Sequence, residues 1–111
     1  MDDHVVLTIQ KDILMDNSRD FYLEFEASVE DVSIRQISLN FGEIKYVDSS
    51  GIGSLIKLTT ICKNKGRSMN VFNLNKALSS VFKLAGLHNV IVVLKKEEFL
   101  DKYPHFKEAI G

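Results

Sequence analysis

The sequence predicts an α/β fold in which covering helices surround a small, mostly parallel β-sheet. The chain has 111 residues, 45% of them apolar, which suits one domain with one core over residues 1–111. Short β-branched runs alternate with stretches of helical periodicity, and the pattern strand-helix occurs four times. Alternation of this kind favours right-handed crossovers between parallel strands.

The first third of the chain supplies a strand, a helix and a second strand. Residues 4–10 are rich in β-branched side chains and are predicted to form a strand. Asp-Asn-Ser at 16–18 is a helix start signal. Residues 36–41 alternate between polar and apolar, as a strand does, and Gly42 interrupts them. The predicted buried stripe of the intervening helix consists of Phe21, Phe25 and Val29.

A second helix is predicted over residues 52–62 and ends near Gly66. Leu58 and Ile61 lie off its main stripe, so they either form a partner patch or are covered by the neighbouring helix, and we favour the second interpretation. Its predicted buried face consists of Ile52, Leu55, Ile56, Thr59 and Cys62.

The remaining elements are a strand at 68–74, a helix at 77–85 and a strand at 90–94. An extra C-terminal helix is predicted at about 96–110, and Pro104 should end or kink it near Tyr103. Its apolar residues keep helical spacing and should cover the core; they are Phe99, Tyr103, Phe106 and Ile110.

Composition excludes several classes of function. The 14 basic and 15 acidic residues give a net charge of −1, which argues against a nucleic-acid partner and a polybasic membrane anchor. A single cysteine, Cys62, offers neither an internal disulfide nor a metal cluster. The acidic first residues are unlike a secretory signal, and no apolar run is long enough to span a membrane. We expect a cytoplasmic protein without metal or cofactor.

The turn at residues 48–53 is the candidate functional site. It joins a predicted strand to a helix N-terminus, where backbone N–H groups and a partial positive charge are presented. Small polar side chains can cap such a helix, and a phosphate is stabilised there. A hydrolase elbow would read Gly-x-Ser-x-Gly, but Val47 stands at the first glycine position, and no histidine is near in sequence. We expect no catalytic residue and no enzyme activity.

Asp48-Ser49-Ser50-Gly51-Ile52-Gly53 resembles the Asp-Ser-Ser-Gly-Leu-Gly signature of STAS domains. The stretches at 37–41 and 81–87 agree with the family pattern, and the resemblance extends over about residues 4–94. It implies a stand-alone bacterial anti-sigma-factor antagonist, a regulator of transcription. In such proteins a serine kinase, which is also the anti-sigma factor, phosphorylates the serine after the aspartate, and a phosphatase resets the cycle. Here that serine is Ser49.

Two other functions stay open beside this one. The chain could be a STAS module of another bacterial signalling complex not tied to a sigma factor. A third hypothesis, of a different functional class, is a small serine hydrolase that uses Ser49. The oligomeric state is expected to be a monomer or a weak dimer.

The resemblance gives each site residue a role, with alternatives. Ser49 is the phosphoacceptor or merely a helix cap. Asp48 orients the Ser49 hydroxyl, helps to hold the kinase's metal, or caps the helix. The bare backbone at Gly53 serves either a partner or a tight internal contact. The expected partner-binding residues are Asp48, Ser50, Gly51, Ile52 and Gly53, with Met15, Asp16 and Asn17 at the rim.

The sequence departs from the family pattern at two places. The family usually has an extra edge strand before the one at residues 4–10. The family also tends to carry Gly-Glu-Leu-Asp where this chain has Lys11-Asp12-Ile13-Leu14, so Lys11 replaces the glycine and Leu14 the second acidic residue. The second departure makes a divergent kinase contact possible.

Overall fold

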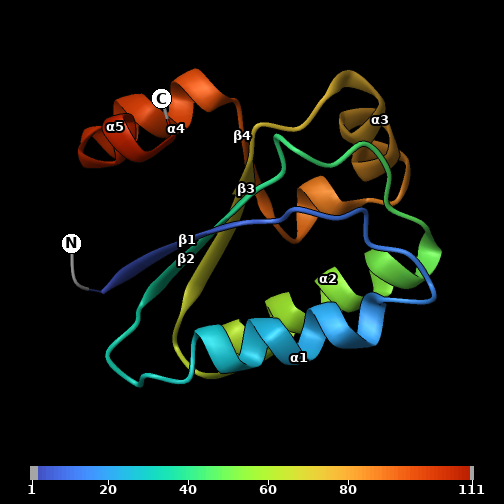
Figure 1. The fold of residues 1–111 in the computed structure, drawn as a ribbon, viewed down its shortest axis with the longest axis horizontal. Coiled ribbons are helices and arrows are strands. Elements are labelled where there is room, and N and C mark those ends of the chain that lie inside the picture. The colour runs from blue at the N-terminus through green and yellow to red at the C-terminus, as the bar shows by residue number, and fades with distance from the viewer. Residues whose placement is uncertain (1–2, 111) are drawn as a thin grey trace.

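A computed structural model describes residues 3–110 (Figure 1). Four parallel strands form one sheet in the order β1-β2-β3-β4, which confirms the predicted parallel α/β fold. Neighbouring strands in the sheet are also consecutive in sequence, so each connection returns the chain to the adjacent position. The strands are β1 (His4–Thr8), β2 (Gln36–Asn40), β3 (Ser68–Phe72) and β4 (Val92–Leu94).

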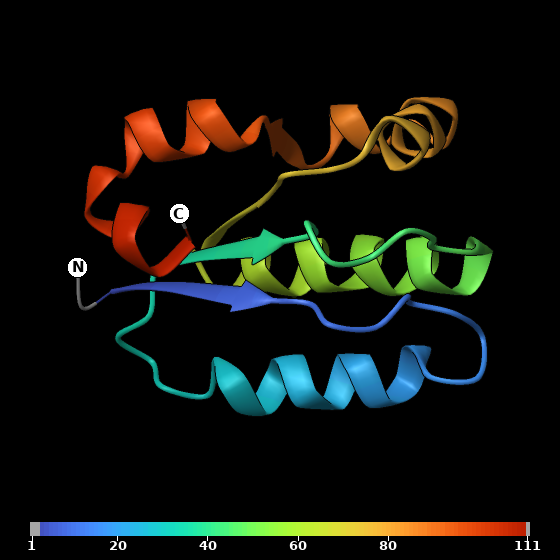
Figure 2. The same cartoon turned by 45° about the horizontal axis from the view of Figure 1, so that its top comes forward.

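Helices cover both faces of this sheet. α1 and α2 lie on one side of it, and α4 and α5 lie on the other, as Figures 1 and 2 show. The helices are α1 (Ser18–Ser28), α2 (Ser49–Asn64), α3 (Lys76–Leu84), α4 (Lys96–Lys102) and α5 (Lys107–Ile110), with 3-10 turns η1 (Leu87–Asn89) and η2 (Pro104–Phe106).

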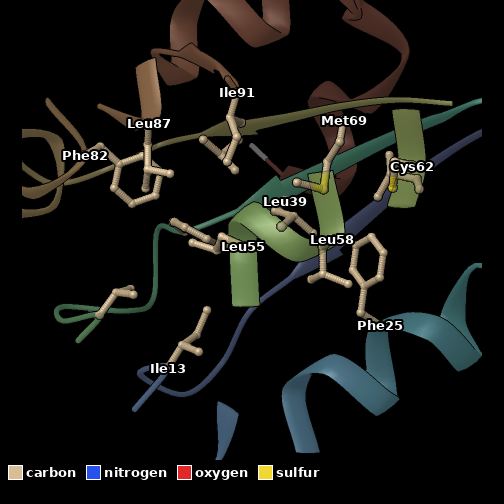
Figure 3. Close-up of a cluster of buried hydrophobic side chains, with 14 of the residues drawn as sticks. Ile13, Phe25, Leu39, Leu55, Leu58, Cys62, Met69, Phe82, Leu87 and Ile91 are labelled. Carbon is tan, nitrogen blue, oxygen red and sulfur yellow. The ribbon is translucent and has the colours of Figure 1, made fainter. Parts of the chain in front are cut away.

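The main core lies between the sheet and the helices α1 and α2 (Figure 3). Alternate residues of each strand share one face, and the in-register pairs Ile37–Met69 and Leu39–Val71 put apolar side chains on the face toward these helices. The predicted stripe of α1 agrees, since Phe25 and Val29 are buried and Phe21 is half-buried. Figure 3 shows Phe25 directed toward Leu58 of α2.

The predicted buried face of α2 was partly wrong. Leu55 and Cys62 are buried as expected, but Ile56 is 42% exposed and Leu58 is completely buried. The reason is that α2 packs against α1 as well as against the sheet, which turns its buried side toward Leu58. Ile61 is half-buried, so burial by the neighbouring helix explains these two residues better than a partner patch does.

The C-terminal segment differs from a continuous helix. α4 ends at Lys102, and η2 begins at Pro104, as that proline predicts. Phe99 is completely buried, and its ring stacks on Phe72 of β3 at 3.8 Å between centroids. The segment thus covers the sheet face opposite α1 and α2, while the side chain of Ile110 lies outside the described residues.

The last strand is shorter than predicted. It begins at Val92 rather than Val90, because the backbone N–H groups of Val90 and Ile91 bond to the carbonyl of Leu87 in η1. Ile91 is nevertheless buried in the core, which explains why the apolar run extends beyond the strand.

Candidate functional site

Asp48 is the N-cap of α2 and the centre of the candidate site. Its Oδ1 accepts a hydrogen bond of 3.0 Å from the Gly51 N–H, and its Oδ2 accepts one of 2.8 Å from the Met15 N–H. The bond from Gly51 is the main cause that holds the pKa of this carboxyl below its usual 3.8. Asp48 therefore stays charged near neutral pH and joins the start of α2 to the loop before α1.

Gly51 allows the two segments to come this close. Ile13 and Val47 form an isolated parallel bridge, and the Asp48 N–H donates to the Ile13 carbonyl at 3.2 Å. A Cβ on Gly51 would lie 2.4 Å from that carbonyl oxygen and 2.6 Å from a methyl of Val47. Gly51 is buried, so the glycine has an internal structural reason.

A second set of hydrogen bonds fixes the loop that precedes α1. The Asp12 Oδ1 accepts from the N–H groups of Lys45 and Tyr46, at 2.8 and 3.2 Å. The Asn17 side chain donates to the Asp12 carbonyl and accepts from the Leu14 N–H, each at 2.7 Å. The predicted rim residues are thus held beside the turn of α2 before any partner is present.

Ser49 is the first residue of α2, and its side chain is exposed. Ser50 is half-buried. Of the roles considered for Asp48, the structure supports that of helix cap. Because Asp48 supplies the cap, capping does not explain why a serine stands at position 49.

Gly53 contrasts with Gly51. It is exposed, and within residues 3–110 a Cβ placed on it would meet no heavy atom within 4 Å apart from its chain neighbours and the nearby backbone of its own helix. An internal packing contact therefore does not explain this glycine. Ser49, Gly53 and Ile56 are spaced four and three residues apart in α2, so they share one face of the helix.

Large apolar side chains are exposed around this turn. Met15 is 75% exposed, Tyr46 56% and Ile56 42%. Met15 was expected at the rim, as were Asp16, which is exposed, and Asn17, which is half-buried. Sequence reasoning missed Tyr46 and Ile56. The sequence signal that could have found Ile56 is its helical spacing from Ser49 and Gly53. Tyr46 has no such signal, because it stands beside Val47 and only the structure shows that Val47 is the buried residue of the two.

The site lacks the arrangement expected of a serine hydrolase. Among the described residues, the serine hydroxyl that lies within hydrogen-bond distance of a histidine belongs to Ser38, 2.8 Å from the His4 Nε2. Both of these residues are buried under the C-terminal segment, so the pair is a structural contact out of reach of a substrate. Within residues 3–110, no three or more His, Cys, Asp or Glu side chains lie close enough together to hold a metal ion. In the same range, no helix has the length and apolarity needed to cross a bilayer.

Comparison with known proteins identifies the family and the fold. The family model "STAS domain" matches residues 1–108. The anti-sigma-B factor antagonist of Bacillus subtilis (strain 168) is 30% identical over 56 residues, which is 50% of this chain and 51% of that protein. The chain thus spans about half the length of that relative in the match.

Two solved structures share the fold at low sequence identity. A putative anti-sigma factor antagonist from Thermotoga maritima superimposes with a TM-score of 0.77 at 18% identity, over 92% of this chain and 88% of that one. The unphosphorylated form of the anti-sigma factor antagonist SpoIIAA gives a TM-score of 0.73 at 17% identity, over 95% and 91%. SpoIIAA from Bacillus is also known in a phosphorylated form, with a TM-score of 0.66 at 18% identity over 92% of each chain.

Proposed function

We propose, from the premise that this chain belongs to the STAS domain family, that it is an anti-sigma-factor antagonist whose binding is switched by phosphorylation of Ser49. The proposed partner is an anti-sigma factor that is also a serine kinase, with a phosphatase that removes the phosphate. The observation that carries the proposal is the exposed Ser49 on one helix face with a bare, exposed Gly53. The chain acts by binding rather than by catalysis, and we place it in the cytoplasm.

Three features suit this face for a protein partner. Gly53 leaves the backbone of α2 open to close approach, and no packing contact with another part of the described chain requires a glycine there. Met15, whose backbone bonds to Asp48, Tyr46, which lies just before the turn, and Ile56 on the same helix face add exposed apolar area. The hydrogen bonds of Asp48 fix the turn in advance, which lowers the entropy lost on binding.

Electrostatics explain how one phosphate would change binding without changing the fold. A phosphate on Ser49 adds about −1.5 to −2 charges near neutral pH. The N-terminus of α2 favours that charge, whereas the ionised Asp48 beside it opposes it. A partner surface fitted to a small neutral turn must leave the new charge unpaired or rearrange, and a buried unpaired charge costs several kcal/mol.

The phosphoacceptor is tested first by intact mass. The protein purified from its own host should contain a species one phosphate heavier, which phosphatase removes. With the purified partner kinase, ATP and Mg²⁺, the wild type and Ser50→Ala should each gain one phosphate, and Ser49→Ala should gain none. Phosphate on Ser50 or Ser54 would overturn the assignment to Ser49.

The partner is tested by capture from host extract. Immobilised wild type should retain an ATP-binding protein that Ser49→Asp retains far less. Titration calorimetry with the purified partner should then show a loss of affinity of about a hundredfold, equal to about 2.7 kcal/mol. Equal affinities would refute the switch. A partner without activity toward any sigma factor would instead indicate a STAS module of another signalling complex.

A further inference from the structure

β1 is an edge strand in the part of the chain that the structure describes. β1 lies at one end of the sheet, and within residues 3–110 only β2 pairs with it. The Ile9 N–H donates to β2 and the Asp3 carbonyl accepts from it, so the odd-numbered residues direct their backbone groups toward β2. By alternation, Val6 and Thr8 direct their N–H and carbonyl groups outward. Such an edge is a template for another strand.

A groove runs along this edge, between β1 and α1. It has a volume of about 220 Å³ and continues into a second hollow of about 390 Å³ that shares Thr8, Ile9, Phe21 and Glu24 with it. Leu7, Ile9 and Phe21 are half-buried there. The C-terminal segment lies on the opposite face of the sheet from α1 (Figure 2), where Phe99 stacks on Phe72. An added strand with apolar residues at alternate positions would fill it.

We propose that a second copy of this chain occupies the groove, by antiparallel pairing of the two β1 strands about a two-fold axis at Leu7. The sequence of this segment is self-complementary about that residue. Leu7 would meet Leu7, and Val5 of one copy would meet Ile9 of the other, so the paired side chains at the centre of the two grooves are all apolar. Val6 would meet Thr8 and exchange backbone hydrogen bonds, because both point outward.

Charge favours the same register. Asp3 and Lys11 lie at equal distances in sequence on either side of Leu7, and both are exposed. The two-fold axis therefore brings Asp3 of each copy toward Lys11 of the other, which lies in the bend beyond the end of β1, so two pairs of opposite charges favour this register. A shift by one residue would lose these pairs and move the apolar side chains relative to each other.

The dimer should be weak. Only the outward groups of one short strand are available for pairing, and an interface normally buries at least about 1,200 Å² to be stable. The groove is also lined by the carboxylates of Asp20 and Glu24, which repel the same residues of the second copy. This inference is independent of the proposed function, since no residue of the Ser49 turn takes part.

Sedimentation velocity tests the proposal over protein concentrations from about 10 μM to about 1 mM, a range that brackets weak association. The wild type should show a sedimentation coefficient that rises with concentration. Val6→Pro should stay monomeric, because proline removes only an outward N–H and an edge strand tolerates it. The matched control is thermal unfolding, which should show that this variant folds.

Charge reversal provides a test that does not depend on proline. Asp3→Lys and Lys11→Asp should each raise the dissociation constant about tenfold, because each creates two like-charge pairs. The double variant should restore the wild-type value to within about threefold. A wild type that remains monomeric throughout would overturn the proposal. So would a dimer that ignores Val6→Pro, or charge reversals that do not compensate, since either result would place another surface or another occupant at the interface.

Discussion

Gly53→Ala should make the protein more stable and a poorer binder. Alanine is favoured over glycine in a helix interior by up to about 1 kcal/mol, partly because glycine loses more freedom on folding. Gly53 lies five residues after the N-cap, its φ is not in the left-handed region, and its Cβ would meet no heavy atom within 4 Å. The full gain is therefore available, and for a chain of this size it should raise Tm by about 3 to 5 °C.

Gly51→Ala is the matched control, two residues earlier in the same helix. Its Cβ would lie 2.4 Å from the Ile13 carbonyl oxygen, which is a backbone atom and cannot rotate away. The segment around Ile13 would have to move away from α2, so we expect the free energy of unfolding to fall by about 1–3 kcal/mol or more. Urea unfolding of wild type and both variants measures the two effects with opposite signs. A Gly53→Ala protein less stable than wild type would refute the claim that this face is free of internal contacts.

The binding half of the prediction uses the same two proteins. If a partner packs against the bare backbone, one methyl group at Gly53 should reduce affinity at least about tenfold, or about 1.4 kcal/mol. The assay is calorimetric titration against the captured kinase. Unchanged affinity of a stabilised Gly53→Ala protein would show that the partner does not touch this part of α2.

Three further predictions concern charge. Ser49→Asp should change the free energy of unfolding by no more than about 1 kcal/mol, since an acidic side chain suits a helix N-terminus; a larger loss in urea unfolding would argue against a switch at this position. Asp48→Ala should speed amide hydrogen exchange at Gly51 and Met15, the two donors it binds, and leave β3 unaffected. Burial, and then the charge of His105, lower the pKa of His4 below 6.5. The unfolded chain then binds more protons, so stability should fall as the pH drops below about 6.5. His4→Gln should flatten this dependence.

The element order was predictable because periodicity reports which side chains are buried. β-branched runs of strand length and apolar residues at helical spacing gave four strands and the helices between them, and Pro104 located the break after α4. The predicted buried face of α2 included Ile56 and left out Leu58, whereas the structure buries Leu58 and exposes Ile56. Spacing alone did not reveal this, because the packing of α1 against α2 determines which side faces inward.

The candidate turn was predictable from its residue types, but the bonds that hold it were not. Nothing local in the sequence shows that Asp48 also binds the Met15 N–H, which is 33 residues away. The two glycines likewise look equivalent in sequence, and only the neighbouring Ile13 separates an internal role from an external one. The burial of His4 depends on Tyr103 and Phe106 from the far end of the chain.

The separation of roles within the turn bears on how a switch can work. Asp48 and Gly51 hold the turn against the rest of the molecule. Asp48 accepts hydrogen bonds from Met15 and Gly51, and Gly51 lies in close contact with Ile13. Ser49 and Gly53 point outward and contribute little to that inner packing. Under the proposed switch, a charge added to Ser49 would therefore act on a surface whose geometry is already fixed by other residues. Because the turn need not rearrange to accommodate that charge, the proposal predicts that the repulsive free energy lowers the affinity for the partner and leaves the stability of the fold nearly unchanged.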